Sequence, residues 1–314
     1  MGSKVVSLFD YHDVPLDIPT FTLDGEALTR ELERLANAHA TWEEGQSVSS
    51  GDMVICDLLS ELPRYQRNQV RLIAGSGMFN RVIEDALIDA RVGEKIEVTL
   101  PEGLVTVTVT SVANRTVCPV DDEMVRDLCL EGVSTVDEYR RHLVSQQMAE
   151  HLASIRFNLV GEIERAVVEG SRFELEESDW ERAASLELNR CAAIARQEGL
   201  DIKTMTPEQF AGRIPVRSYE ELVAMTQETS WNSLRHFLLG RCYAAIDGFT
   251  VSEKDYRAHI EEYAKAWHLT DEQAREAQPW ELYCFNSHCI HAYDLWGAWV
   301  ERRYYEINDP SSFY

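Results

Sequence analysis

The chain has 314 residues, of which 45% are hydrophobic and 27% are charged, and these values are ordinary for a globular protein. Its formal net charge of −24 at pH 7 is far from zero. A surface this acidic repels phosphate groups, so we expect neither nucleic acid nor anionic membrane as a direct partner. The sequence shows no apolar run near the roughly 20 residues of a membrane span and no signal-peptide core, which predicts a cytoplasmic protein.

The first 48 residues are predicted to form an extended connector and then a helix. Pro15 and Pro19 restrict helix formation before residue 22. Three leucines recur at helical spacing between residues 22 and 44, and acidic residues precede them, as the start of a helix favours.

Residues 49–118 carry the apolar runs and the alternation that are typical of strands. The predicted strands cover residues 53–59, 70–73, 96–100 and 104–112. Gly75-Ser76-Gly77 ends the second of these runs in a tight turn that needs conformational freedom. A short helix is predicted next, because four apolar residues between positions 82 and 87 share one helical face.

Beyond residue 119 the sequence is predicted to be helical. The pattern Ser or Thr followed three residues later by Glu or Gln starts a helix at Thr135, Ser218 and Thr270. Apolar residues then recur at spacings of three and four. The long helices predicted in this way cover about 135–168, 178–197, 218–246 and 280–305, and a short one follows Thr206-Pro207.

Three stretches resemble trigger factor, a family of bacterial nascent-chain chaperones that contain an FKBP-type prolyl isomerase domain. The most specific stretch keeps these positions of the family's glycine-rich motif: Gly75, Gly77, Phe79, Glu84, Ala86, Leu87, Ile88, Val92, Gly93 and Glu94. Residues 119–124 resemble the family's junction into its C-terminal domain. Residues 249–256 resemble the turn between two of its arm helices, and the resemblance covers most of residues 5–308.

The resemblance implies an α+β fold with three consecutive parts. Residues 1–48 would form an extended connector and a linker helix. Residues 49–118 would form a small FKBP-like antiparallel sheet domain with one short helix, and residues 119–314 an all-α, two-armed chaperone domain. Nothing in the sequence matches the family's ribosome-binding domain, so we expect a shortened form that does not dock on the ribosome.

The resemblance also indicates where an isomerase pocket would lie. Its candidate lining residues are Asp57, Leu58, Phe79, Ile83 and Val109. The family's Ile-Pro-Gly-Phe is replaced by residues 80–83, Asn-Arg-Val-Ile, and its flap hairpin is reduced to residues 101–103. Because prolyl isomerisation needs a dry apolar pocket, we expect this domain to be inactive. The alternative is an active isomerase with a remodelled pocket that uses Asp57, Phe79 and Ile83.

Aromatic residues gather in the C-terminal half, where five of the seven tryptophans lie from Trp231 onward. A helical cradle that holds unfolded chains needs exposed apolar patches, and tryptophan and tyrosine suit a partly wet surface. The residues predicted to contact clients are Trp231, Trp267, Trp280, Tyr283, Phe285, Trp296 and Trp299. The alternative for each of them is a place in the core between helices.

Cys284, His288, Cys289 and His291 form the one cluster of metal-ligand residue types in the sequence. Positions 284, 288 and 291 would share one face of a helix, but a fourth ligand and the paired spacing of zinc sites are missing. We therefore expect no metal and no cofactor. The seven cysteines have no regular spacing, which indicates reduced thiols.

These features predict an ATP-independent holdase that binds unfolded, nascent or partly assembled polypeptides. Two alternatives come from other functional classes. One is the active prolyl isomerase described above. The other is an interaction protein dedicated to one partner, with a homodimer formed through the aromatic last helix.

Overall fold

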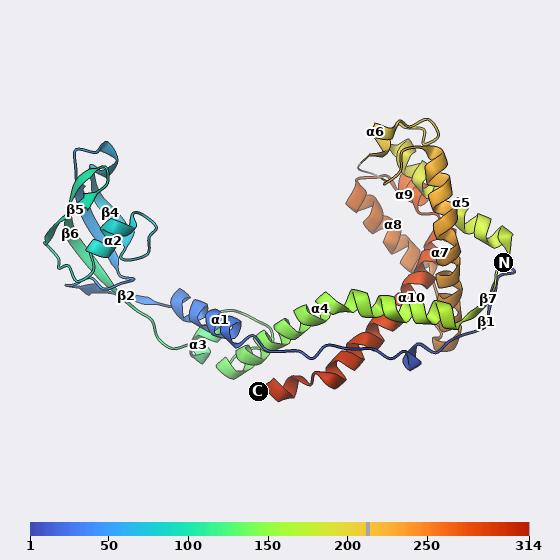
Figure 1. The fold of residues 1–314 in the computed structure, drawn as a ribbon, viewed down its shortest axis with the longest axis horizontal. Coiled ribbons are helices and arrows are strands. Elements are labelled where there is room, and N and C mark those ends of the chain that lie inside the picture. The colour runs from blue at the N-terminus through green and yellow to red at the C-terminus, as the bar shows by residue number, and fades with distance from the viewer. Residues whose placement is uncertain (212–213, 314) are drawn as a thin grey trace. The chain divides into compact units, whose positions relative to one another are not determined.

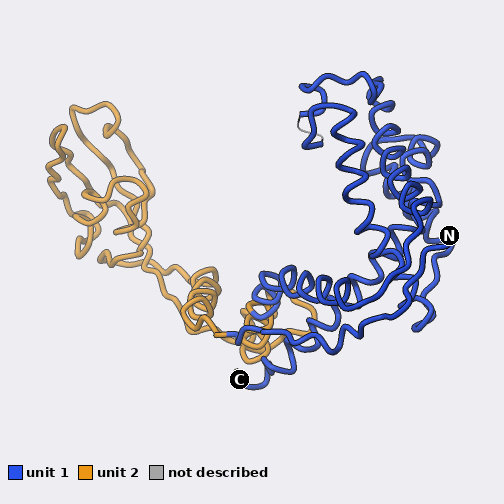
Figure 2. Tube along the Cα trace, turned by 45° about the vertical axis from the view of Figure 1, so that its right-hand side comes forward, with its two compact units in different colours: residues 1–21, 148–312 blue, residues 22–147, 313–314 orange. Residues whose placement is uncertain are grey.

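A computed structural model describes residues 1–211 and 214–313 (Figure 1). The chain forms two compact units, shown in different colours in Figure 2. Unit 1 contains residues 1–21 and 148–312, and unit 2 contains residues 22–147 together with residue 313. Unit 1 is mainly helical and unit 2 contains the larger sheet, which confirms the α+β prediction.

The sheet of unit 2 is antiparallel and has five strands. These are β2 (Thr41–Gly45), β3 (Met53–Leu59), β4 (Arg67–Ile73), β5 (Lys95–Leu100) and β6 (Gly103–Thr116). The long β6 pairs with β2, β3 and β5, while β4 pairs with β3. Strand side chains alternate between two faces, so Val105, Val107 and Val109 all enter the core.

The structure differs from the sequence prediction at both ends of this sheet. The linker helix α1 (Gly25–Ala38) ends earlier than predicted, and β2 replaces its expected last turns. Four of the five β2 residues are exposed, so this strand depends on its pairing with β6 and has no apolar pattern of its own. At the other end, Leu100 pairs with Gly103, so β6 begins one residue earlier than predicted and only Pro101 and Glu102 lie in the turn that joins β5 to β6.

Three helices complete unit 2. They are α1, α2 (Arg81–Ala86) and α3 (Asp122–Arg126), and they are joined by the first turns of α4 (Val136–Gly170). Leu35 of α1, Val125 of α3 and Tyr139 of α4 share a second small apolar core.

Unit 1 contains the remainder of α4 and six further helices. These are α5 (Glu177–Gln197), α6 (Pro207–Phe210), α7 (Tyr219–Asp247), α8 (Glu253–Trp267), α9 (Asp271–Ala277) and α10 (Trp280–Ile307). The hydroxyls of Ser218 and Thr270 accept hydrogen bonds from backbone N–H groups of α7 and α9, as the capping patterns predict. None of the helices in the described ranges is both long enough and apolar enough to span a membrane.

The two longest helices of the C-terminal region, α7 and α10, pack closely at Gly240. A methyl group on Gly240 would lie 1.8 Å from the carbonyl oxygen of His288, a distance that no side chain tolerates. Leu234, Leu238 and Phe285 fill the apolar core beside this crossing. Because the two backbones almost touch there, Gly240 fixes where α7 and α10 cross.

The N-terminal segment is held on unit 1 by a small sheet that the sequence pattern did not predict. Strand β1 (Lys4–Ser7) pairs antiparallel with β7 (Arg172–Glu174). Just before β1, the N–H groups of Gly2 and Ser3 donate to Asp179 at 2.9 and 2.7 Å. Asp179 is buried, and although burial alone would raise its pKa, these N–H groups hold the pKa below its usual value.

A buried glutamate organises the turn that leads into α2. Glu84 accepts hydrogen bonds from the N–H groups of Phe79 and Asn80 at 2.6 and 3.2 Å, from the Ser76 hydroxyl at 2.8 Å, and from the N–H of Gly77. Burial alone would raise the pKa of Glu84, but the hydrogen bonds from Phe79 and Ser76 and the others of this set hold it below its usual value. The carboxylate therefore acts as a template around which the turn closes.

Replacement of Glu84 by glutamine should destabilise unit 2 by about 2 kcal/mol, because one carbonyl oxygen cannot accept all of these hydrogen bonds. The lowered pKa means that the contribution of Glu84 is complete above the unfolded-state pKa of about 4.3 and is lost as pH falls through the folded-state value. Hydrogen exchange of β3 and β6 measures the effect. Glu102→Gln, which changes an exposed ion pair with Arg64, is the matched control; equal losses in both variants would contradict the prediction.

Replacement of Asp179 by alanine should release the N-terminal strand, because the N–H groups of Gly2 and Ser3 then lose their acceptor. We expect the free energy of opening of β1 from β7 to fall by about 2 kcal/mol, while the helices of unit 1 keep their protection from exchange. Hydrogen exchange of residues 2–7 and 172–174 tests this. The exposed neighbour Glu177→Gln serves as the control, and unchanged exchange of β1 in Asp179→Ala would refute the prediction.

Candidate functional site

Three of the residues predicted to line an isomerase pocket lie inside the core of the sheet. Ile83 and Val109 are both 0% exposed, and Leu58 is almost completely buried. All three pack in one cluster with the inner faces of β3, β5 and β6. Side chains without exposed surface cannot contact a prolyl substrate unless the core opens.

The other two candidates lie at the margin of that core. Asp57 accepts a hydrogen bond from the N–H of Gln69 at 2.8 Å, across the pair β3–β4. Phe79 is half-buried and meets the ring of Tyr65 edge to face at 6.2 Å. Both side chains are therefore committed to local structure.

The segment that replaces the family's Ile-Pro-Gly-Phe forms the start of α2. The side-chain oxygen of Asn80 accepts hydrogen bonds from the N–H groups of Val82 and Ile83 at 3.1 and 3.3 Å. Its amide nitrogen donates to the hydroxyl of Tyr65 at 2.9 Å. A polar helix cap thus stands where the family has an apolar pocket wall.

A row of aromatic side chains runs along α8 and the start of α10 in unit 1, and we call it the aromatic row. Its members, in order along the row, are Trp280, Tyr256, Tyr283, His259, Tyr263 and Trp267. Neighbouring ring centroids are 5.0 to 6.2 Å apart. The row joins three of the predicted client-binding residues, at positions 267, 280 and 283, with three residues that the sequence analysis did not select.

Exposure is greatest at the two ends of the aromatic row. Trp267 is 67% exposed and Trp280 is 40% exposed. Tyr283, His259 and Tyr263 are half-buried between them. Tyr256, the remaining member, is buried. The row therefore presents apolar surface to solvent mainly at its two ends, and indole rings suit such a partly wet surface for transient apolar contacts.

An apolar pocket of about 340 Å³ adjoins the exposed end of the row. Its apolar walls come from α5 and the segment that follows it: Ile194, Leu200, Ile202, Met205 and Phe210. Trp267 lines the same pocket, so the pocket and the aromatic row form one continuous apolar surface. We call this pocket the end pocket.

Two of the predicted client-binding residues are interhelical core. Trp296 is 0% exposed, and its indole N–H donates to the hydroxyl of Tyr243 at 3.4 Å. Phe285 is buried and stacks on Phe237 with ring centroids 4.6 Å apart. These two residues therefore lie in the core between helices, which was the alternative prediction, because α7 and α10 pack directly over them.

The remaining two predicted residues are half-buried and already have aromatic partners. Trp231 stacks on Trp180 of α5 at 5.0 Å. Trp299 meets the ring of His12 edge to face at 4.7 Å. Neither residue joins the aromatic row in the described structure.

The cysteine and histidine cluster of α10 makes separate local contacts. Nδ1 of His288 lies 2.8 Å from the carbonyl oxygen of Cys284, and Cys289 contacts a carbonyl of α7. Nε2 of His291 lies 2.8 Å from a carboxylate oxygen of Asp247. Within residues 1–211 and 214–313, no group of three or more such side chains is placed to hold a metal ion.

The sequence contained a signal for the part of the aromatic row that was missed. Tyr256, His259, Tyr263 and Trp267 recur at intervals of three and four, the spacing of one helical face. The family motif at residues 249–256 indicates only the start of α8. Aromatic residues at helical spacing indicate the rest of this part of the row.

The chain is similar to several trigger factors. Trigger factor 1 of Desulfitobacterium hafniense is 23% identical over 87% of this chain and 67% of its own length. The trigger factor of Pelotomaculum thermopropionicum is 24% identical over 86% of this chain and 65% of its own length. A trigger factor of Streptococcus equi subsp. zooepidemicus is 25% identical over 86% of this chain and 66% of its own length. No protein-family model matches the chain.

A solved structure of the trigger factor chaperone aligns with 96% of this chain and 79% of its own, at 15% identity and a TM-score of 0.39. A score this low supports no conclusion about how the parts are arranged. In sequence, the chain spans about two thirds of the length of the relatives that it matches. These matches extend far beyond the glycine-rich motif and confirm the resemblance: the chain is similar to trigger factors over most of its length.

Proposed function

We propose that this protein is an ATP-independent chaperone that holds unfolded, nascent or partly assembled polypeptides on the helices of unit 1. The observation that carries the proposal is the continuous apolar surface formed by the aromatic row and the end pocket. Relationship to trigger factors over most of the chain supports the same class of function.

The size of the individual contacts explains why such a chaperone needs no ATP. Burying about 100 Å² of apolar surface on an aromatic side chain contributes roughly 2.5 kcal/mol. One contact of this size is weak, and several give a dissociation constant in the micromolar range once the entropy of association is included. A client held in this way dissociates spontaneously and can fold between encounters.

The charge of the chain complements the apolar surface. A net charge of −24 repels other copies of the chain and keeps a chaperone that carries a bound client in solution. It also favours clients that are basic or neutral. An apolar surface on an uncharged protein of this size would instead promote self-association.

We further propose that the FKBP-like domain has no isomerase activity. The support is the full burial of Ile83 and Val109 together with the polar cap formed by Asn80. A retained fold does not require a retained activity. The sheet domain would then act as a structural or client-contacting part of the molecule.

Suppression of the aggregation of a denatured client should require a concentration of the double variant Trp267→Ser/Trp280→Ser about tenfold higher than that of the wild type. Loss of two exposed indoles removes about 1.4 kcal/mol or more of binding free energy. Light scattering after dilution of the client from denaturant measures its aggregation. Phe157→Ser, which removes a residue of α4 that is 86% exposed, is the matched control; an equal loss in this control, or an inactive wild type, would refute the proposal.

The wild-type chain should not accelerate cis–trans isomerisation of a proline-containing tetrapeptide or the proline-limited refolding of a small protein. The uncatalysed barrier of about 20 kcal/mol then persists, because no apolar pocket receives the proline. A protease-coupled assay and refolding fluorescence measure the two rates. Acceleration of either one would favour the alternative of an active enzyme.

A further inference from the structure

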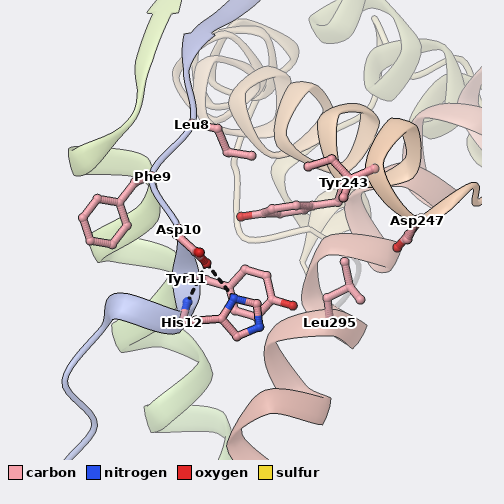
Figure 3. A pocket seen from close by; sticks show the side chains of 9 residues that line it. Leu8, Phe9, Asp10, Tyr11, His12, Tyr243, Asp247 and Leu295 are labelled. Atoms are coloured by element: carbon pink, nitrogen blue, oxygen red, sulfur yellow. Dashed lines mark hydrogen bonds and ion pairs between the residues drawn. The ribbon is translucent and has the colours of Figure 1, made fainter.

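A second cavity in unit 1, with a volume of about 310 Å³, lies apart from the aromatic row and the end pocket. It is enclosed by residues 8–12 of the N-terminal segment, the end of α7 and the middle of α10 (Figure 3). Leu8 and Leu295 supply apolar walls, Tyr11 and Tyr243 supply aromatic walls, and Asp10 and Asp247 supply carboxylates. We call this cavity the connector pocket.

The aromatic walls of the connector pocket are set at right angles. The rings of Tyr11 and Tyr243 have centroids 5.6 Å apart and an interplanar angle of 87°. In Figure 3 the hydroxyl of Tyr243 points toward the N-terminal segment, and that of Tyr11 points toward α10. A long side chain that entered between these walls would meet an aromatic face and a hydroxyl together.

The two carboxylates lack a permanent positive partner. Asp10 accepts from the N–H of His12 at 3.0 Å and lies 2.6 Å from its Nδ1. Asp247 accepts from the N–H of Phe249 at 3.0 Å and lies 2.8 Å from Nε2 of His291. Both aspartates are exposed to solvent. No lysine or arginine of the part of the chain that the structure describes forms an ion pair with either carboxylate. The pocket is therefore available to an external cation.

Both carboxylates act electrostatically on the same group of the pocket, the Tyr11 hydroxyl. Burial raises the pKa of the Tyr11 hydroxyl, and the charges of Asp10 and Asp247 raise it further. Two carboxylates that come from different elements thus act together on one aromatic group. A cation placed beside Tyr11 would gain from both of them.

We propose that the connector pocket binds an arginine side chain of a polypeptide client. The guanidinium group is planar, stacks on aromatic faces and donates to carboxylates through a fixed fork of N–H groups, and its three-carbon stem suits walls of leucine. The two carboxylates attract a cation more strongly than an uncharged group, and they repel an anion. This inference rests on the proposed function, because it assumes that the ligand belongs to a polypeptide.

The connector pocket would add selectivity to a surface that has little of its own. The aromatic row accepts any apolar segment, because contacts of this kind have no directional requirement. A pocket that binds one type of charged side chain favours clients with arginine near an apolar stretch. In a chain with 54 acidic residues, such basic segments are also attracted over longer distances.

The test uses the full chain and three labelled, unstructured peptides that are identical except for a central arginine, lysine or glutamine. Fluorescence anisotropy should show that the arginine peptide binds at least tenfold more tightly than the glutamine peptide, and that Asp10→Asn/Asp247→Asn removes this preference. Asp294→Asn, an exposed aspartate of α10 outside the pocket, should keep it. Higher salt should weaken the binding of the arginine peptide more than that of the glutamine peptide.

Three results would overturn the inference. Equal binding of arginine and lysine peptides would mean a general basic site, and equal loss in Asp294→Asn would mean a diffuse charge effect. No preference for arginine in the wild type would exclude the pocket outright. The same wild-type sample is assayed for suppression of aggregation: suppression without the preference would reject the pocket alone, whereas absence of suppression would count against the proposed function.

Discussion

The attachment of the N-terminal segment to the helices of unit 1 is the interaction on which the connector pocket depends. At one end Asp179 binds the N–H groups of Gly2 and Ser3, and at the other the N–H of Phe21 donates to Asn308 at 2.6 Å. The segment between them closes the connector pocket against α7 and α10. One buried carboxylate and one buried amide thus fix the two ends of this segment, and the pairing of β1 with β7 and the buried side chains of Val14 and Ile18 hold it between them. The cavity exists because the segment is held.

In unit 2, residues of the family motif have structural roles. Glu84 belongs to the family motif, and the structure explains its presence without reference to catalysis, since its carboxylate closes the turn that leads into α2. Asn80 departs from the motif and still caps the same helix. Both residues therefore support the backbone at the start of α2, and a fold supported in this way does not by itself require a retained activity.

The sequence allowed most helices to be predicted with accurate ends, because caps such as Ser218 and Thr270 act locally. Strands β1, β2 and β7 could not be predicted in this way, since each is defined by a partner far away in the chain. The candidate site was predictable only in part. Trp267 and Trp296 are the same residue type on helices of similar pattern, but one is exposed and the other is completely buried. Only the packing of α7 against α10 decides this difference, and no local pattern records it.

Two surfaces of different physical character lie on unit 1, and their combination has a consequence for binding. In the function proposed above, the aromatic row would offer several weak, non-directional contacts, whereas the connector pocket would offer a single charged and directional one. For a client that engages both surfaces, the overall association constant is the product of the two individual constants multiplied by the effective concentration that the client's own chain sets. Such a client is still released one contact at a time, so a preference for particular clients can coexist with rapid dissociation. Selectivity therefore does not require tight binding, which is the condition that a chaperone without ATP must meet.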